Sequence, residues 1–223
     1  TGTGSMTLGG AINGGYNLTI SLTNAGISLP AVTLTNNSNI SVTTGGVITQ
    51  SGILTIPGTA SFNAGANAIT LTQNNLVTGA VALTNTGANN VSFTNNRALV
   101  LSGSSIGQNL TLLANGAISQ LAAISVNGTS NISAGANTID LLTNGISNNF
   151  VGAVTLSNSG SNNVSIKNNT ALTITASTVG SGLLTANATG AITLAGNLNV
   201  GSGAGNVSLV STASISESGS AFI

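Results

Sequence analysis

Apolar and polar residues alternate along short stretches of this chain, and the alternation has a period of two. The runs include Leu54-Thr55-Ile56, Ala60-Ser61-Phe62, Ile69-Thr70-Leu71, Val81-Ala82-Leu83, Val91-Ser92-Phe93 and Leu99-Val100-Leu101. This period predicts half-buried β-strands. Gly, Asn and Pro-Gly turn signals separate the runs, and no helical pattern persists for three turns. We therefore expect an all-β chain without helices.

Equivalent strands recur after one short circuit of the chain. The same spacing of 21 positions separates Ile48 from Ile69, Val91 from Leu112, and Ile118 from Ile139. A chain that completes one circuit over this spacing stacks each strand on its counterpart, with parallel pairing and an apolar interior. The pattern predicts a right-handed parallel β-helix, or β-solenoid, with about three short strands per coil. At about 4.8 Å per coil, about ten coils make a rod roughly 50 Å long.

A longer repeat is superimposed on the coils. Gly46-Val-Ile-Thr-Gln50 returns as Gly116-Ala-Ile-Ser-Gln120 and as Gly190-Ala-Ile192-Thr-Leu194, so the period is 70 and then 74 positions. Such self-similarity is typical of a repetitive stack. Residues 46–115 and 116–189 form two copies, with partial copies on both sides. The path before Gly46 is shorter by about one coil, which indicates a lost coil. Residues 1–223 are interpreted as one domain.

Asparagines provide a second pattern that follows the repeat. Five of them have counterparts at a constant offset of 73 positions: Asn85, Asn89, Asn90, Asn95 and Asn96 correspond to Asn158, Asn162, Asn163, Asn168 and Asn169. Asn tolerates turn conformations and can bond to its own image in the next coil. We therefore expect these ten residues, together with Ile48, Ile69, Ile118, Ile139 and Ile192, to be the structural stacking positions.

Several units resemble those of a known group of proteins. The segments Ile-Thr-Gln-Ser-Gly-x-Leu-Thr, Ala-Gly-Ala-Asn-x-Ile-x-Leu and Gly-Ala-Val-x-Leu-x-Asn are similar to passenger repeats of filamentous-haemagglutinin-like bacterial exoproteins and adhesins, of the two-partner secretion or autotransporter type. The resemblance spans about Gly46 to Leu194. It implies a right-handed β-helix that is extracellular or on the bacterial cell surface, where such passengers act as stalks, adhesins, biofilm matrix or toxin carriers.

Composition narrows the possible environments and partners. Only 2% of the residues are charged, 41% are hydrophobic, and the formal net charge is zero. The chain has enough apolar surface to order itself, while repulsion between copies is almost absent. No run reaches the roughly 18 apolar residues of a membrane helix, so no membrane insertion is expected. Two cations cannot neutralise a phosphate track, which argues against nucleic-acid binding.

The inventory of reactive side chains argues against an enzyme. The charged residues are Arg97, Asp140, Lys167 and Glu217, and the chain has no His and no Cys. A Ser-His-Asp triad is impossible, paired carboxylates are lacking, and calcium-binding repeats would need an Asp in every coil. A Ser-Lys pair that uses Lys167 is the catalytic alternative that stays open. Across the repeat, Arg97, Asp140 and Lys167 align with Thr170, Thr70 and Thr94, as outward positions do. We therefore expect no catalytic residue, cofactor or metal.

Three functions remain open at this point. The first is an extracellular structural rod or fibre-forming segment that self-associates, because the strand edges lack the Lys and Glu residues that normally prevent pairing with another chain. The second is an adhesin that binds a host or cell-surface glycan through one solenoid flank. The third is ice binding through Thr-x-Thr triplets such as Thr33-Leu-Thr35, Thr70-Leu-Thr72 and Thr173-Ile-Thr175. The repeat argues against ice binding because Thr70 and Thr72 become Asp140 and Leu142.

Overall fold

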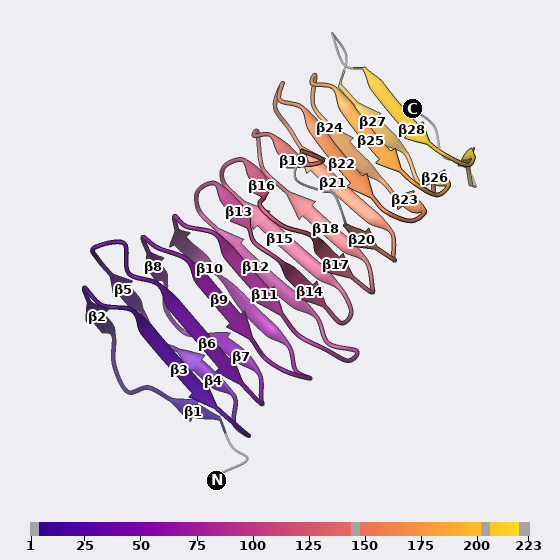
Figure 1. Ribbon diagram of the computed structural model, residues 1–223. Helices are drawn as coiled ribbons and strands as arrows, with labels where there is room; N and C mark the ends of the chain where they lie inside the picture. Colours follow the sequence, from indigo (N-terminus) through magenta and orange to yellow (C-terminus); the bar gives the residue numbers. More distant parts are fainter. Residues whose placement is uncertain (1–4, 144–147, 202–205, 219–223) are drawn as a thin grey trace.

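The chain folds into a rod of stacked parallel strands, with the N-terminus and C-terminus at opposite ends (Figure 1). The computed structural model describes residues 5–143, 148–201 and 206–218. Within these ranges all regular elements are β-strands and none is a helix. The strands form a β-solenoid of about 10 turns with roughly 21 residues per turn. The all-β solenoid predicted from the alternating pattern is confirmed.

Most turns combine one longer strand with a pair of short strands, so three strands per turn are common. The longer strands are β3 (Leu18–Leu22), β6 (Ile40–Thr44), β9 (Ala60–Asn63), β11 (Val81–Thr84), β12 (Val91–Asn95), β15 (Leu110–Ala114), β18 (Ser130–Ser133), β21 (Val154–Asn158), β22 (Val164–Asn168), β25 (Leu184–Ala188) and β28 (Val207–Ser211). The short pairs are β1 (Met6–Thr7) with β2 (Ile12–Gly14), β4 (Ile27–Leu29) with β5 (Val32–Leu34), β7 (Ile48–Gln50) with β8 (Leu54–Ile56), β13 (Leu99–Leu101) with β14 (Ser104–Ile106), β16 (Ile118–Gln120) with β17 (Ile124–Val126), β19 (Ile139–Leu141) with β20 (Asn149–Phe150), β23 (Leu172–Ile174) with β24 (Ser177–Val179), and β26 (Ile192–Leu194) with β27 (Leu198–Val200). The two members of one such pair are fused in β10 (Ile69–Val77), and β29 (Ile215–Glu217) is the last described strand.

The strands belong to two sheets that face each other across the core. The path of the 16-stranded sheet is β1-β4-β7-β10-β12-β15-β18-β21-β23-β26-β29. The path of the 13-stranded sheet is β20-β17-β14-β11-β13-β16-β19-β22-β25-β28, and β3, β6 and β9 join it through β11. Each sheet therefore runs along the rod, and one turn of chain contributes to both.

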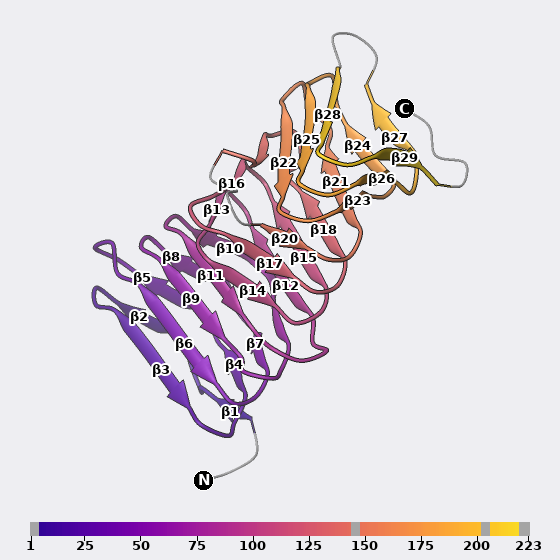
Figure 2. The same cartoon turned by 45° about the vertical axis from the view of Figure 1, so that its right-hand side comes forward.

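The two sheets exchange roles twice along the rod. The longer strands β3, β6, β9 and β11 lie in the 13-stranded sheet, β12, β15, β18 and β21 lie in the 16-stranded sheet, and β22, β25 and β28 lie in the 13-stranded sheet again. Figure 2 shows β3, β6 and β9 side by side near one end and β22, β25 and β28 near the other. Each exchange occurs where two longer strands follow one another, at β11–β12 and at β21–β22.

The exchange gives the sequence repeat an unexpected geometry. Val91 in β12 and Val164 in β22 are equivalent positions of consecutive repeats, and they lie in different sheets. At roughly 21 residues per turn, the repeat offset of 73 positions corresponds to about three and a half turns. Equivalent residues of consecutive repeats therefore face opposite sides of the rod.

The register between turns agrees with the expected spacing in two of three places. Ile48 pairs with Ile69, and Ile118 pairs with Ile139, as predicted. Val91 pairs with Leu110, two positions earlier than predicted, so the expected pairing with Leu112 is wrong. Leu110 and Leu112 both point inward, and period-two alternation cannot distinguish two inward positions of one strand.

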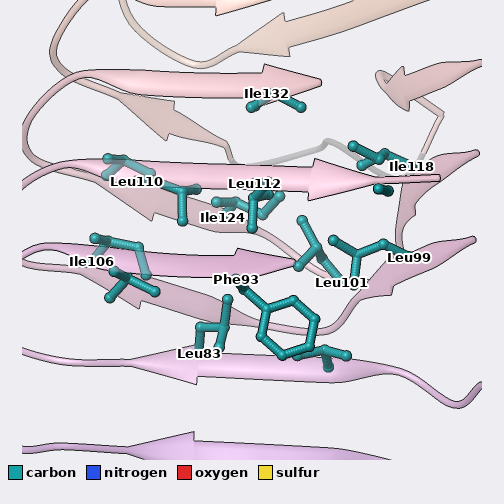
Figure 3. Close-up of a cluster of buried hydrophobic side chains, with 14 of the residues drawn as sticks. Leu83, Phe93, Leu99, Leu101, Ile106, Leu110, Leu112, Ile118, Ile124 and Ile132 are labelled. Atoms are coloured by element: carbon teal, nitrogen blue, oxygen red, sulfur yellow. The ribbon is translucent and has the colours of Figure 1, made fainter. Parts of the chain in front are cut away.

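The core is one continuous column of apolar side chains from Ile27 to Leu198. Figure 3 shows part of it, with Leu83, Phe93, Leu112 and Ile124 pointing from different strands into the space between the sheets. The ring centroids of Phe62 and Phe93 lie 6.3 Å apart, within the range of favourable aromatic pairs. Ile192 lies between Leu172 and Ile215 in register. Each turn thus buries its apolar residues against its neighbours.

Gly79 lies where two turns approach closely, and its substitution is expected to destabilise the rod. A Cβ atom at Gly79 would lie 2.4 Å from the carbonyl oxygen of Gly58, whereas a Cβ atom at Gly103 meets nothing closer than 3.8 Å. We expect Gly79→Ala to lower the free energy of unfolding by about 2 kcal/mol, and Gly103→Ala to change it by less than about 0.5 kcal/mol. Urea denaturation checks both values, and equal effects would contradict the close approach.

Candidate functional site

Among the residues that the structure describes, six asparagine side chains are buried inside the rod, as three pairs related by the repeat offset. Asn75, Asn85, Asn95, Asn148, Asn158 and Asn168 are each no more than 1% exposed. A buried amide needs hydrogen-bond partners because an unsatisfied polar group is destabilising. The partners of these six residues define the roles of the conspicuous asparagines.

Asn95 and Asn168 connect strands at the two exchanges. The Asn95 Oδ1 atom accepts from the Val77 N–H at 2.9 Å, and its Nδ2 atom donates to the Val77 carbonyl at 2.9 Å. Asn168 makes the same two bonds to the N–H and carbonyl of Phe150, at 2.7 and 3.1 Å. The side-chain amide therefore pairs with the last residue of β10 or β20 as a further strand residue would.

A serine completes each exchange on the opposite sheet. In β11, Val81 pairs with β13 and Thr84 pairs with β14. Leu83 therefore faces the gap between β13 and β14. The Leu83 N–H donates to the Ser104 Oγ atom at 3.1 Å. At the second exchange the Leu156 N–H donates to the Ser177 Oγ atom at 3.0 Å. One buried Asn and one buried Ser thus satisfy the backbone groups at each exchange.

The third pair of buried asparagines forms networks that the sequence interpretation missed. The amides of Asn75 and Gln50 donate to each other at 2.8 and 3.0 Å, and the Leu54 N–H donates to Asn75 Oδ1. The amides of Asn148 and Gln120 donate to each other at 2.9 and 3.0 Å in the same way. The sequence does contain a signal for these networks: Gln50 and Gln120 occupy positions where the alternation predicts inward apolar residues.

The remaining conspicuous asparagines bond mainly to backbone groups of the turns. Asn85 and Asn158 donate to the carbonyls of Asn67 and Asn137, and Asn89 and Asn162 donate to those of Ala66 and Ala136. Asn90 and Asn163 accept from the N–H groups of Asn109 and Leu183 in the next turn. Asn96 accepts from Asn115, and the Asn169 carbonyl accepts from Thr189.

Bonding of an asparagine to its image in the next turn is found at two of these positions: Asn96 accepts from Asn115, and Asn90 accepts from the N–H of Asn109. The other conspicuous asparagines bond to other groups. The counterparts at the offset of 73 positions are different residues: they lie one full repeat away, on the opposite sheet and several turns along the rod. Two counterparts share a role because each satisfies the same backbone groups in its own repeat. This role fixes their positions in the sequence, and it does not require the two side chains to touch.

The outer surface of the 16-stranded sheet carries an uncharged ladder of small polar residues, which we call the hydroxyl ladder. Its rungs follow the strand register up to the second exchange, where the register shifts by two positions, and then continue. The rungs are Thr7, Ser28, Thr49, Thr70, Ser92, Thr111, Asn131, Thr155, Thr173, Thr193 and Ser216. An alignment of the repeats does not reveal this ladder. It matches Thr70, a rung of the ladder, with Asp140, which lies in the other sheet.

The charged residues lie apart from the hydroxyl ladder for most of the rod. Arg97 lies in the turn after β12 and donates to the Thr78 Oγ1 atom at 2.6 Å, while Asp140 and Lys167 lie in the 13-stranded sheet. Glu217 lies in β29, next to the last rung. Among the described residues, no three His, Cys, Asp or Glu side chains lie close enough together to hold a metal ion.

Asp140 is expected to make stability depend on pH. Burial raises the pKa of its carboxyl, but hydrogen bonds from Thr143, the Leu142 N–H and the Ser165 hydroxyl outweigh burial and lower the pKa below 3.8. A lowered folded-state pKa stabilises the fold above the unfolded pKa, and this stabilisation is lost as the pH falls through the folded value. The urea midpoint should be constant from about pH 8 to 5 and fall below about pH 4. Asp140→Asn should reduce this fall; an undiminished fall in that variant would contradict the assignment.

Grooves on the described surface include one near the C-terminal end and one at the first exchange. The former, of about 500 Å³, is lined by β24 and β27, including Thr178 and Asn199. The other, of about 250 Å³, lies beside the first exchange and is lined by Asn74, Asn96, Asn115 and Leu113 among others. In the part of the chain that the structure describes, no helix is long and apolar enough to cross a membrane.

A protein-family model of a repeat matches this chain. Its description is repeats of unknown function, DUF5649, and it matches residues 15–84, 88–157 and 161–216. Comparison with curated proteins and with solved structures gives no match.

The matched units agree with the geometry of the rod. Their starts are evenly spaced by the repeat offset, just before β3, β12 and β22, and the gaps between them coincide with the two exchanges. The first unit runs in full from residue 15 to residue 84, so the coil that we expected to be lost before Gly46 is not missing. Three matches that together cover most of its length show that the chain belongs to the DUF5649 family of repeats.

Proposed function

We propose that this chain is an extracellular structural rod or fibre-forming segment of a bacterial surface or secreted protein, acting in surface filaments, in biofilm matrix or as an adhesin stalk. The observation that carries the proposal is the pair of parallel sheets that run along the rod over one uninterrupted core. Such a solenoid extends by adding turns, and each turn is stabilised by its neighbours. The resemblance of its units to exoprotein passengers supports the extracellular location.

Self-association is the second part of this proposal. The chain has four charged residues among 223 and no net charge, so electrostatic repulsion between copies is weak. Electron microscopy and sedimentation of the purified chain in neutral buffer test the idea. We expect laterally bundled or lengthened particles whose mass grows with protein concentration. A monodisperse monomer at high concentration would reject self-association and leave a passive stalk.

The location has its own test. Antibody labelling of intact native cells, with and without protease treatment, should detect the protein on the surface or in the surrounding matrix. Labelling only after cell lysis would reject the extracellular assignment.

A second candidate function is binding of a host or cell-surface glycan. The groove beside the first exchange favours it, because Asn74, Asn96 and Asn115 offer amides next to Leu113, which is 47% exposed. Amides with one apolar contact suit a neutral sugar. Glycan-array binding that is lost in Asn115→Ala and retained in Asn199→Ala would support this candidate. The absence of any glycan signal would reject it.

A further inference from the structure

We propose that two copies of the rod pair side by side through the 16-stranded sheet, with the hydroxyl ladder of each copy against that of the other. This inference rests on the proposed self-association and specifies the surface that carries it. The 13-stranded sheet is expected to stay outside the contact.

The chemistry of the rungs suits a second copy of the same surface. The rungs from Thr7 to Ser216 carry hydroxyl groups, except for the amide of Asn131. A hydroxyl both donates and accepts hydrogen bonds, and so does an amide. Two identical ladders are therefore complementary to each other, as a symmetric dimer interface requires. A ladder of like charges would repel its copy instead.

The spacing of the rungs also matches a second copy. Neighbouring strands of a sheet lie about 4.8 Å apart, and the rungs are in register from strand to strand up to the second exchange. A partner that contacts many rungs must have the same spacing, or it loses register within a few of them. Another copy of this solenoid has that spacing by construction, because its rungs come from the same parallel pairing.

The area of the surface is sufficient for a weak, specific dimer. About ten rungs give a length of roughly 48 Å, and strands of three to five residues give a width of roughly 10 to 16 Å. Each copy would then bury about 600 Å², or about 1,200 Å² in total, at the lower limit of stable interfaces. Leu113 is 47% exposed on the same sheet and adds an apolar contact.

The 13-stranded sheet also carries outward hydroxyl residues, among them Ser41, Ser61, Ser165 and Thr185, but unlike the hydroxyl ladder it is charged in the middle of the row. Asp140 and Lys167 interrupt its surface, in β19 and β22. Pairing of two copies through this sheet in register would place each Asp140 near the Asp140 of the other copy. That contact requires desolvation of like charges, which disfavours it.

Single cysteines test the face, because the chain has no cysteine of its own. Thr111→Cys places a thiol on the hydroxyl ladder in β15, and Ser61→Cys places one at a similarly exposed position of β9 in the other sheet. Under mild oxidation of the full chain, we expect at least about tenfold more disulfide-linked dimer for Thr111→Cys than for Ser61→Cys. Equal yields would overturn the proposed face.

Introduced charges give a second, independent readout. Thr70→Lys combined with Thr111→Lys should weaken association by at least about tenfold in sedimentation experiments. The matched control, Thr43→Lys with Ser61→Lys on the 13-stranded sheet, should leave association unchanged. If the wild-type chain assembles but both double variants behave alike, the pairing face is wrong and self-association stands. If the wild-type chain stays monomeric throughout, both proposals fail.

Discussion

Replacement of Asn95 with alanine is expected to destabilise the rod by about 4 kcal/mol. The substitution removes the side-chain amide that pairs with the N–H and carbonyl of Val77 and donates to the Ala98 carbonyl. Val77 is 1% exposed, so water cannot replace these bonds without entering the core. Each buried group left without a partner costs about 1 to 3 kcal/mol, and two or three groups are affected. Urea denaturation measures the loss in free energy of unfolding.

The neighbouring asparagine is the matched control. Asn96 is exposed, and its side chain bonds to that of Asn115. Asn96→Ala should therefore cost less than about 0.5 kcal/mol. Asn95→Asp should be as damaging as Asn95→Ala, because it keeps the acceptor for the Val77 N–H but turns the donor toward Val77 and Ala98 into an acceptor. Similar stabilities of Asn95→Ala and Asn96→Ala would contradict the role of Asn95 at the exchange.

Replacement of Phe93 with alanine is expected to cost about 3 to 5 kcal/mol, because it leaves a cavity in a closely packed column. The Phe93 side chain is 1% exposed, and the centroid of its ring lies 6.3 Å from that of Phe62 in β9 of the other sheet. Stacked turns cannot collapse sideways into the space, because the backbone of each turn is fixed by hydrogen bonds to both neighbours. Thermal or urea unfolding checks the value.

The repeat itself provides the control for Phe93. Ile166 occupies the equivalent inward position of β22 and is fully buried. Phe93→Ile should therefore retain most of the stability, with a loss well below that of Phe93→Ala. An alanine variant as stable as the isoleucine variant would show that this part of the column is loosely packed.

Much of the fold follows from local patterns in the sequence. Alternation over Val91-Ser92-Phe93 and Ile69-Thr70-Leu71 is sufficient to predict strands, because one face of each strand must be buried. The equal spacing of Ile48 and Ile69 and of Ile118 and Ile139 is sufficient to predict a solenoid, since only stacking of successive turns brings these residues together.

The exchange of roles between the sheets could not be predicted from these patterns. It depends on the succession of two longer strands, β11 and β12, where a pair of short strands would otherwise follow. Longer strands and short strands alternate inward and outward side chains in the same way. The alternation therefore does not indicate which sheet a strand joins. The sequence signal of the exchange is Asn95, an amide at an inward position, and its counterpart Asn168.

The hydroxyl ladder was hidden for a related reason. The length of chain in one turn varies, and the path from Val91 to its partner Leu110 is shorter than the path from Ile139 to its partner Val164. A fixed period therefore does not place Ser92, Thr111 and Asn131 in one row. The repeat period also misleads, because it compares Thr70 with Asp140, which lies on the other side of the rod.

Disulfide trapping across both exchanges measures whether the sheets exchange roles about every three and a half turns. Thr84 pairs with Ser105 at the first exchange, and Ser157 pairs with Thr178 at the second, at the equivalent place of the next repeat. Partners on neighbouring parallel strands lie about 4.8 Å apart, within disulfide range, whereas residues two turns apart do not. We expect Thr84→Cys with Ser105→Cys and Ser157→Cys with Thr178→Cys both to form intramolecular disulfides, and Thr84→Cys with Ser125→Cys to form none. Disulfide formation in the last variant without the first two would contradict the exchange of roles.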